Sequence, residues 1–520
     1  MANEADNNST PKENEPKEFQ QPAWFTPERL LIILCVINLL NYVDRGAIAS
    51  NGVNGFQGNS TCREDEACFQ GTGIVGDFSL SYFQDGILSS AFMVGLLIAS
   101  PIFADLSKTF NPMRLIGVGL SVWTIATAGC GLSGDFWSIA CFRMLVGVAE
   151  ASFVSLAAPF IDDYAPPGKR TAWLSLFFAC MPVGVALGYM YGGIVGGMWG
   201  WRMAFWLESL AMLPFAVFGF LSSPVHLKHH LYHDPSKTSD EHYPDHSTAL
   251  LNDAGDSSTG EFGGRRGGAW RMYMRIMYIP VEYMRILCSQ GADFLEDIKK
   301  LLAEKVYVID VVGFIAYNFV VGAYGYWGPK IGQALYGIGN ADVVFGVVTI
   351  FSGILGTLFG GFALDHIGST IPTAFKFLSI VTCIGGVMCF LAFLATDLLW
   401  FIPLFAIGEF SIFAVQGPMI FVALHSVPPK MRPIALAIST VSIHIFGDVP
   451  SSPIVGVVQD YVQNWRISAL LLTTFFFLAS AIWACGTLLK IPERKVLAVD
   501  EEKHDLAEEE AVAVLLGAGP

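Results

Sequence analysis

The sequence predicts an all-α membrane protein with twelve transmembrane helices in two pseudo-symmetric six-helix bundles. Three observations support this fold class. Of the 520 residues, 53% are hydrophobic and only 14% are charged, whereas soluble domains carry about a quarter of charged residues. The apolar residues gather in stretches of about twenty, which is the length that spans a bilayer. Landmarks in the first half of the chain also recur in the second half at a nearly constant offset.

The apolar stretches fall into two sets of six, separated by a polar segment. We expect a disordered cytoplasmic N-terminus (1–26), an N-terminal bundle (27–223), a cytoplasmic central loop (224–305), a C-terminal bundle (306–490) and a cytoplasmic tail (491–520). The predicted spans are 28–49, 80–104, 113–133, 136–161, 171–197, 201–222, 306–328, 341–364, 371–395, 398–426, 432–460 and 466–489.

The distribution of Lys and Arg among the loops predicts the orientation of the chain. Basic residues are concentrated on the side that carries both termini and the central loop, so this side is predicted to be cytoplasmic. In the loops, that side has Lys108, Arg114, Lys169, Arg170, Lys376, Lys430 and Arg432, and the opposite side has Arg63, Arg202, Lys330 and Arg466.

The first loop on the opposite side contains a glycosylation sequon, Asn59-Ser60-Thr61, and two cysteines, Cys62 and Cys68. One interpretation is a glycan on Asn59 and a small loop closed by a disulfide. The alternative is an unused sequon and two free thiols. The sequence leaves both open.

The stretch 136–161 is an apolar helix that carries two opposite charges, Arg143 and Glu150. They are seven residues apart and therefore share a helix face. That face is not expected to contact lipid, because a charge at mid-membrane costs roughly 2.5–3.5 kcal/mol. Counted along the helices, Asp44 and Arg143 lie at similar depth, about 24 and 27 Å from the cytoplasmic ends, so this depth allows a pair between them across the cavity. Arg45 points about a quarter-turn away from Asp44 and is a candidate partner for Glu150.

These four charges have two interpretations. They form either a buried structural network or a site that binds a charged headgroup and exchanges protons, which is the usual role of ionisable residues inside a membrane. Arginine suits phosphate because its guanidinium binds two oxygens at once. His444 and Asp448, four residues apart on one face, are a further candidate proton site, although a core histidine without such a role is the alternative. Glu208, Asp310 and Glu409 also fall in or near predicted spans, and the sequence assigns them no role.

An internal repeat is visible in three landmarks. Asp105 matches Asp365 at an offset of 260 residues, the turn 166–170 (PPGKR) matches 428–432 (PPKMR) at 262, and Trp201 matches Trp465 at 264. Two parallel six-helix halves resemble the major facilitator superfamily. The segment Gly360–Gly368 (GGFALDHIG) is similar to its loop signature, and the first-half copy keeps only the aspartate. The resemblance implies that Asp105 and Asp365 are gating residues, each capping a neighbouring helix end.

A closer resemblance rests on three segments. These are Asn41–Arg45 (NYVDR), Arg143 with Glu150-Ala151-Ser152, and His444–Pro453 (HIFGDVPSSP). Together they resemble the spinster family of lipid transporters. The resemblance implies export of sphingolipids or lysolipids, coupling to protons, and a late endosomal or lysosomal membrane. We expect a monomer whose partners are an amphipathic lipid, protons and membrane lipids, with Asp44, Arg45, Arg143, Glu150, His444 and Asp448 in substrate and proton coupling.

The sequence argues against several other classes. It lacks a phosphate-binding G-x-x-x-x-G-K-[ST] motif, H-E-x-x-H and G-x-S-x-G, so we expect neither an ATP-driven pump nor a hydrolase. No C-x-x-C or zinc spacing is present, and the net charge of −15 does not suit nucleic acid. We expect no enzyme activity, cofactor or metal.

Two other functions stay open. One is a major facilitator carrier for a small organic anion, using the same charges. The other is a transceptor or scaffold that signals through the central loop. In that loop, residues 269–305 alternate apolar and charged residues, which predicts either an amphipathic helix on the cytoplasmic leaflet or a linker helix packed on the bundle.

Overall fold

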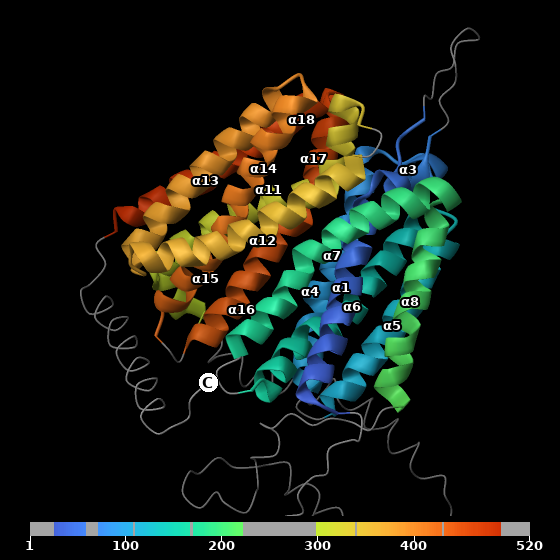
Figure 1. The fold of residues 1–520 in the computed structure, drawn as a ribbon, viewed down its shortest axis with the longest axis horizontal. Coiled ribbons are helices and arrows are strands. Elements are labelled where there is room, and N and C mark those ends of the chain that lie inside the picture. The colour runs from blue at the N-terminus through green and yellow to red at the C-terminus, as the bar shows by residue number, and fades with distance from the viewer. Residues whose placement is uncertain are drawn as a thin grey trace, which may run out of the picture.

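The computed structural model describes residues 25–58, 71–107, 110–166, 170–221, 298–338, 341–428 and 431–489, and their regular structure is helical (Figure 1). Among these residues, eleven helices are long and apolar enough to cross a membrane, which confirms the all-α membrane class. The twelfth predicted span, 201–222, coincides with helix α8 (Trp201–Leu221). Both termini and most of the central loop lie outside the described residues.

The N-terminal helices begin at capping residues that the sequence places at the start of each span. Thr26 caps α1 and is followed by Pro27. Asn111 caps α5, and Asp135 forms a capping box with Ser138 at the start of α6. The helices of this half are α1 (Pro27–Ala49), α2 (Asn51–Asn54), α3 (Gly73–Asp77), α4 (Tyr82–Leu106), α5 (Pro112–Leu132), α6 (Phe136–Tyr164), α7 (Arg170–Trp199) and α8.

The C-terminal half differs from the prediction in two helices that are interrupted. The span predicted at 398–426 breaks at Val415, and the span predicted at 432–460 contains a π-helical turn, η3. Such a turn carries one extra residue and is frequent at functional sites. The helices of this half are α11 (Lys305–Tyr336), α12 (Ala341–Ile367), α13 (Ile371–Leu394), α14 (Leu398–Ala414), α15 (Gln416–His425), α16 (Arg432–Ile443), η3 (His444–Asp448), α17 (Val449–Val462) and α18 (Trp465–Thr487).

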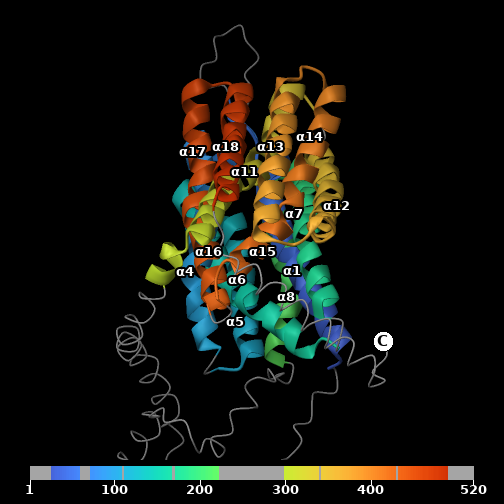
Figure 2. The ribbon, with the colours of Figure 1, turned by 90° about the vertical axis from the view of Figure 1, so that its left-hand side faces the viewer.

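Several helix contacts of the first half recur between the corresponding helices of the second half, and Figure 2 shows the bundle from the side. In the first half α4 packs on α6, α5 on α6 and α8, and α1 on α7; in the second half α12 packs on α14, α13 on α14 and α18, and α11 on η3 and α17. The contacts between the halves are also related, since α4 packs on α17 and α7 on α12. The arrangement therefore reproduces the repeat that the sequence landmarks indicate.

Hydrogen bonds join the two halves near the end of the bundle that carries α2, α3 and the start of α4, here called the α3 end. The carboxylate of Asp460, from α17, accepts the backbone N–H groups of Tyr82 and Phe83, both at 2.9 Å, and so caps α4 from the other half. The hydroxyl of Tyr189 donates to the carbonyl of Gly325 at 2.6 Å. The N–H of Asn51 donates to Asp342 Oδ1 at 2.9 Å. The halves are thus held together at this end.

Helices α1 and α7 approach each other closely because glycines line their contact. A Cβ on Gly46 would lie 2.1 Å from the carbonyl oxygen of Val185, and a Cβ on Gly188 would lie 2.3 Å from that of Val43. No side chain fits at either position, so the two backbones are in direct contact, as small residues allow between membrane helices.

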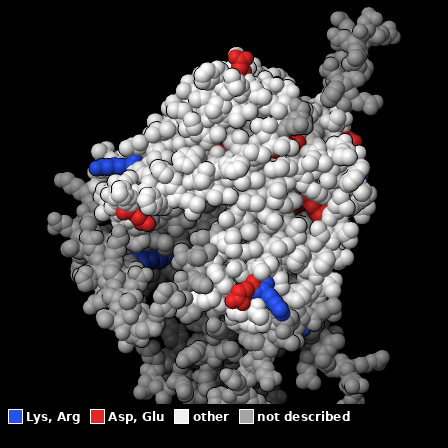
Figure 3. Space-filling view, viewed as in Figure 1, with Lys and Arg blue, Asp and Glu red and all other residues white. Residues whose placement is uncertain are grey.

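The outer surface of the bundle is apolar. Figure 3 shows a face that is predominantly uncharged, with few and separate Lys, Arg, Asp and Glu side chains. Large apolar side chains are exposed on it, such as Leu355, Leu358 and Phe362 of α12. An exposed apolar surface of this extent is incompatible with water and fits a bilayer, and the chain is a multi-pass membrane protein.

Candidate functional site

Arg143 and Asp44 form a buried ion pair inside the N-terminal half. Asp44 comes from α1 and Arg143 from α6, and Nη1 of Arg143 donates to both carboxylate oxygens of Asp44 at 2.8 Å. The two residues are 1% and 0% exposed. The structure thus joins the two side chains that depth counting placed at one level.

Arg45 and Glu150 form a second pair beside the first. Nη2 of Arg45 donates to Glu150 Oε1 at 2.6 Å, and Arg45 keeps some contact with solvent. The ring centroid of Phe92 is close to both arginines, 4.7 Å from the Arg45 guanidinium carbon and 5.3 Å from that of Arg143. Such cation–π contacts contribute roughly 0.5–2 kcal/mol each. Asp44, Arg45, Arg143 and Glu150 are called the Arg143 cluster below.

Several polar atoms of the Arg143 cluster have no hydrogen-bond partner among the described residues. They are Nε of Arg143, Nε of Arg45 and Oε2 of Glu150. An unsatisfied buried polar group costs about 1–3 kcal/mol, and a charged one costs more. The cluster therefore has spare donors for an anionic group and a spare acceptor for a proton, which a purely structural salt-bridge network does not require.

Glu208 of α8 lies beside the Arg143 cluster and was given no role by the sequence. It is buried, it is close to Asp44 and Arg143, and neither of its carboxylate oxygens has a hydrogen-bond partner among the described residues. Its position within a predicted span was the only sequence feature that pointed to Glu208. The sequence could not show that this residue lies on the face of α8 that is turned toward α1.

In the C-terminal half, His444 and Asp448 lie on the π-helical turn. Nδ1 of His444 and Oδ2 of Asp448 are 2.6 Å apart. The side-chain amide of Asn318, from α11, donates to the other oxygen of Asp448. Asp448 also lies near Tyr42, on α1, and the Arg45 guanidinium lies over the ring of Tyr42, 4.5 Å from its centroid. Tyr42 is therefore common to the surroundings of both sites.

Of the two predicted gating residues, Asp365 is described with its side chain and Asp105 only with its backbone. Asp365 lies at the end of α12 and accepts a hydrogen bond from the hydroxyl of Ser369 at 2.9 Å, directly before the start of α13. The backbone of Asp105 belongs to α4, and its side chain lies outside the described part of the chain. The same is true of all of Asn59, Cys62 and Cys68.

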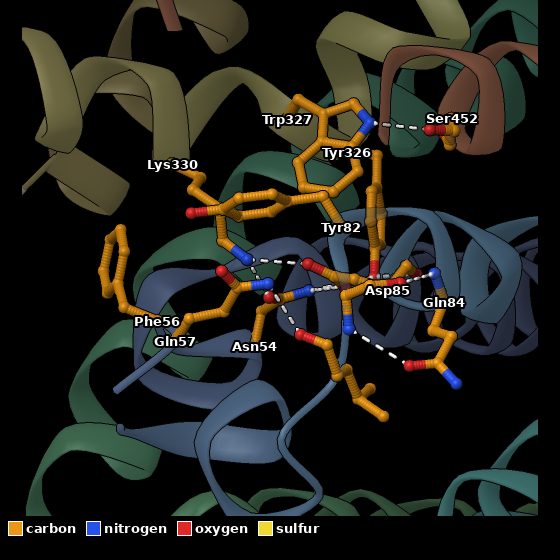
Figure 4. Close-up of polar contacts among 12 residues, drawn as sticks. Asn54, Phe56, Gln57, Tyr82, Gln84, Asp85, Tyr326, Trp327, Lys330 and Ser452 are labelled. Atoms are coloured by element: carbon orange, nitrogen blue, oxygen red, sulfur yellow. Dashed lines mark hydrogen bonds and ion pairs between the residues drawn. The ribbon is translucent and has the colours of Figure 1, made fainter. Parts of the chain in front are cut away.

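A third polar cluster lies at the α3 end and was missed by sequence reasoning (Figure 4). Nζ of Lys330, from α11, lies 2.7 Å from Asp85 Oδ2, from α4, and also donates to Asn54 Oδ1, from α2. The hydroxyl of Tyr326 donates to Asp85 Oδ1 at 2.6 Å, and the side-chain amide of Asn54 donates to the same oxygen at 2.7 Å. All four residues are buried. They are called the Lys330 cluster below.

The Lys330 cluster was missed because the end of one helix was predicted too early. The predicted span ends at residue 328, which places Lys330 in a loop. In the structure α11 continues to Tyr336. Lys330 is therefore a buried helix residue in the contact between the halves.

Comparison with known proteins agrees with this architecture. The model of the Major Facilitator Superfamily matches residues 69–447, and the chain belongs to this superfamily of membrane transporters. The chain is 52% identical over 498 residues to a protein of Arabidopsis thaliana named "Probable sphingolipid transporter spinster homolog 2", covering 96% of this chain and 94% of that one. It is 48% identical over 502 residues to "Probable sphingolipid transporter spinster homolog 1" of the same plant, covering 96% of each. Within the superfamily, the chain belongs to the spinster family.

A solved structure shares the fold. It is the inward-facing, unoccupied form of "a bacterial homolog to human lysosomal transporter, Spinster", with a TM-score of 0.65 and 16% identity, over 89% of this chain and 97% of that one. At this identity the likeness concerns the fold alone, and it agrees with the two-bundle arrangement.

Proposed function

We propose that the protein moves sphingolipids or lysolipids across a membrane by alternating access, with a proton as the coupling ion. The observation that carries the proposal is the Arg143 cluster, two buried acid–arginine pairs with unpartnered donors inside the apolar span. The printed names of the Arabidopsis relatives support the substrate class.

The arginines suit the headgroup of such a lipid. An arginine that moves from its acid to a lipid phosphate leaves the acid without a counter-charge. A carboxyl group in apolar surroundings binds a proton more readily when its arginine is removed. Headgroup binding and proton uptake are then linked, because both depend on the same guanidinium.

Alternating access requires the halves to separate at each end in turn. The hydrogen bonds at the α3 end, between Asp460 and α4 and within the Lys330 cluster, favour a state closed at that end. On the Lys/Arg distribution, the α3 end faces the lumen and both termini face the cytoplasm. The spinster resemblance favours a late endosomal or lysosomal membrane and a monomer.

The test is counterflow in proteoliposomes. Purified protein is loaded with unlabelled lysophospholipid or sphingosine-1-phosphate, and the uptake of labelled lipid and the internal pH are recorded. We expect substrate-stimulated uptake with a matching pH change. If a small organic anion such as lactate competes fully and lysolipids do not, the protein is instead an organic-anion carrier.

A further inference from the structure

The Lys330 cluster is built to hold an ammonium group. Besides Asp85 Oδ2 at 2.7 Å and the oxygen of Asn54, three aromatic rings surround Nζ of Lys330. Their centroids lie 5.3 Å (Trp327), 5.7 Å (Phe56) and 5.9 Å (Tyr82) from the nitrogen. Aromatic rings within about 6 Å of an ammonium group attract it through the negative potential of the ring face.

The parts of this site belong to different halves of the protein. Asn54, Phe56, Tyr82 and Asp85 come from the N-terminal half, whereas the ammonium itself is on α11 (Figure 4). When the halves separate at the α3 end, Lys330 leaves with the C-terminal half. The N-terminal half then keeps the Asp85 carboxylate, the Asn54 amide oxygen and the rings of Phe56 and Tyr82. Together these groups form an empty site for an ammonium group.

Separation of the pair is costly unless another cation takes the place of Lys330. Breaking a buried ion pair by removing one partner leaves an uncompensated charge, which is strongly unfavourable. A lipid whose headgroup carries a primary amine can supply the replacement. Its acyl chain can lie along the apolar surfaces of the helices while its amine binds Asp85.

We propose that Asp85, with Asn54, Phe56 and Tyr82, is a binding site for the primary ammonium group of an amphiphilic substrate, and that Lys330 occupies it while the α3 end is closed. This inference rests on the proposed function and adds to it a preference for lipids that carry an amine. A headgroup with both phosphate and amine then meets a cationic site at the Arg143 cluster and an anionic site at the α3 end.

The first test compares sphingosine with N-acetylsphingosine, in which an added acetyl group converts the amine into an uncharged amide. Binding is measured by thermal stabilisation of the purified full-length protein. In Lys330→Met the internal competitor is absent, and we expect sphingosine to bind about tenfold more tightly than to the wild type, since a cation–π and ion-pair contribution of about 1.4 kcal/mol is a factor of ten. N-acetylsphingosine should bind both proteins equally. The gain for sphingosine should vanish in Asp85→Leu/Lys330→Met.

A matched control is available at the same end of the molecule. Arg202 and Asp77 form an ion pair at 2.6 Å that is well exposed to solvent and lies within one half. Arg202→Met removes one positive charge, as Lys330→Met does, and should leave the affinity for both lipids unchanged. An equal gain in sphingosine affinity in Arg202→Met would show a general charge effect and overturn the proposal.

A second measurement covers the case in which Lys330→Met does not fold. Hydrogen exchange is recorded on the wild-type protein for the peptide spanning α2 and for the start of α4, with each lipid in turn. We expect sphingosine to change exchange in these peptides and N-acetylsphingosine to leave it unchanged. Equal effects of the two lipids would refute the ammonium site.

These readouts separate the two proposals. If both lipids are transported and the amine has no effect at the α3 end, the ammonium site is wrong and the transport function stands. If neither lipid is transported but sphingosine alone alters the α3 end, the site stands and the transport function is wrong.

Discussion

Arg143 contacts both carboxylate oxygens of Asp44 through one nitrogen, Nη1, at 2.8 Å each. A guanidinium that used its full fork on the acid would have two nitrogens committed. Here Nε of Arg143 has no partner among the described residues. Arg143 can therefore bind an incoming oxygen through Nε before it releases Asp44. The guanidinium then moves from one acceptor to the other without being left unpaired in the apolar interior.

The first prediction concerns Arg143. Arg143→Ala should reduce lipid counterflow by at least about a hundredfold, because a headgroup contact of two charge-assisted hydrogen bonds contributes about 1.5–3 kcal/mol each. Counterflow in proteoliposomes measures it.

The control for this substitution must separate function from folding. Removing one partner of a buried pair destabilises by about 3–5 kcal/mol, so Arg143→Ala will also lower the thermal stability. The double variant Asp44→Asn/Arg143→Gln removes both charges and should regain stability without regaining transport. Wild-type counterflow in this double variant would show that the pair is structural.

The second prediction concerns the two acids of the Arg143 cluster. Asp44→Asn and Glu150→Gln keep the side-chain size and remove titration. We expect net transport driven by a pH gradient to fail in each, while lipid binding and exchange between equal pools persist. The lipid-evoked pH change should be absent. Asp77→Asn, an exposed acid in an ion pair, is the matched control and should behave as the wild type. An unshifted pH profile in both cluster variants would move the coupling step to His444 and Asp448.

The third prediction concerns Glu208. Its carboxyl group lies next to Asp44, and neither of its oxygens has a hydrogen-bond partner among the described residues. Glu208→Gln keeps the side-chain size, removes the titratable group and offers Asp44 an N–H donor. Thermal stability should be kept within about 1 kcal/mol of the wild type, since the size is unchanged and a donor is added beside the Asp44 carboxylate. The pH dependence of counterflow should flatten. Loss of folding without any change in the pH profile would contradict this role.

The fourth prediction concerns the orientation, and it rests on sequence positions outside the described residues. Asn59 should carry a glycan when the protein is made in a eukaryotic cell, and Cys62 and Cys68 should be oxidised to each other. A glycosidase shift that disappears in Asn59→Gln checks the first point. Thiol labelling of intact vesicles with and without reductant checks the second, and ready labelling of both cysteines without reductant rules out the disulfide.

The fold and much of the candidate site could be predicted from the sequence, because a membrane imposes strict spacing. A charge inside an apolar span must find a partner at its own depth, and this rule alone placed Arg143 opposite Asp44. The rule failed where a helix end was misplaced. The predicted span ends at residue 328, so Lys330 was assigned to a loop, whereas α11 continues to Tyr336 with Pro329 inside it.

The π-helical turn could not be predicted either, because its extra residue has no spacing signal in a single sequence. It positions His444 and Asp448 on one turn beside Asn318. For Glu208, the sequence supplied the residue but not the rotation of α8, which depends on the packing of α8 against α5 and α1.

The glycine contact between α1 and α7 has a mechanical consequence. Since Gly46 and Gly188 bring the backbones together without intervening side chains, the two helices have no layer that can be compressed or repacked between them. We therefore expect α1 and α7 to move together as one unit. Helix α7 is also in contact with α12 of the opposite half. In the alternating-access cycle proposed above, a movement of α12 is therefore expected to shift α7 and α1 together, and with them Asp44 and Arg45.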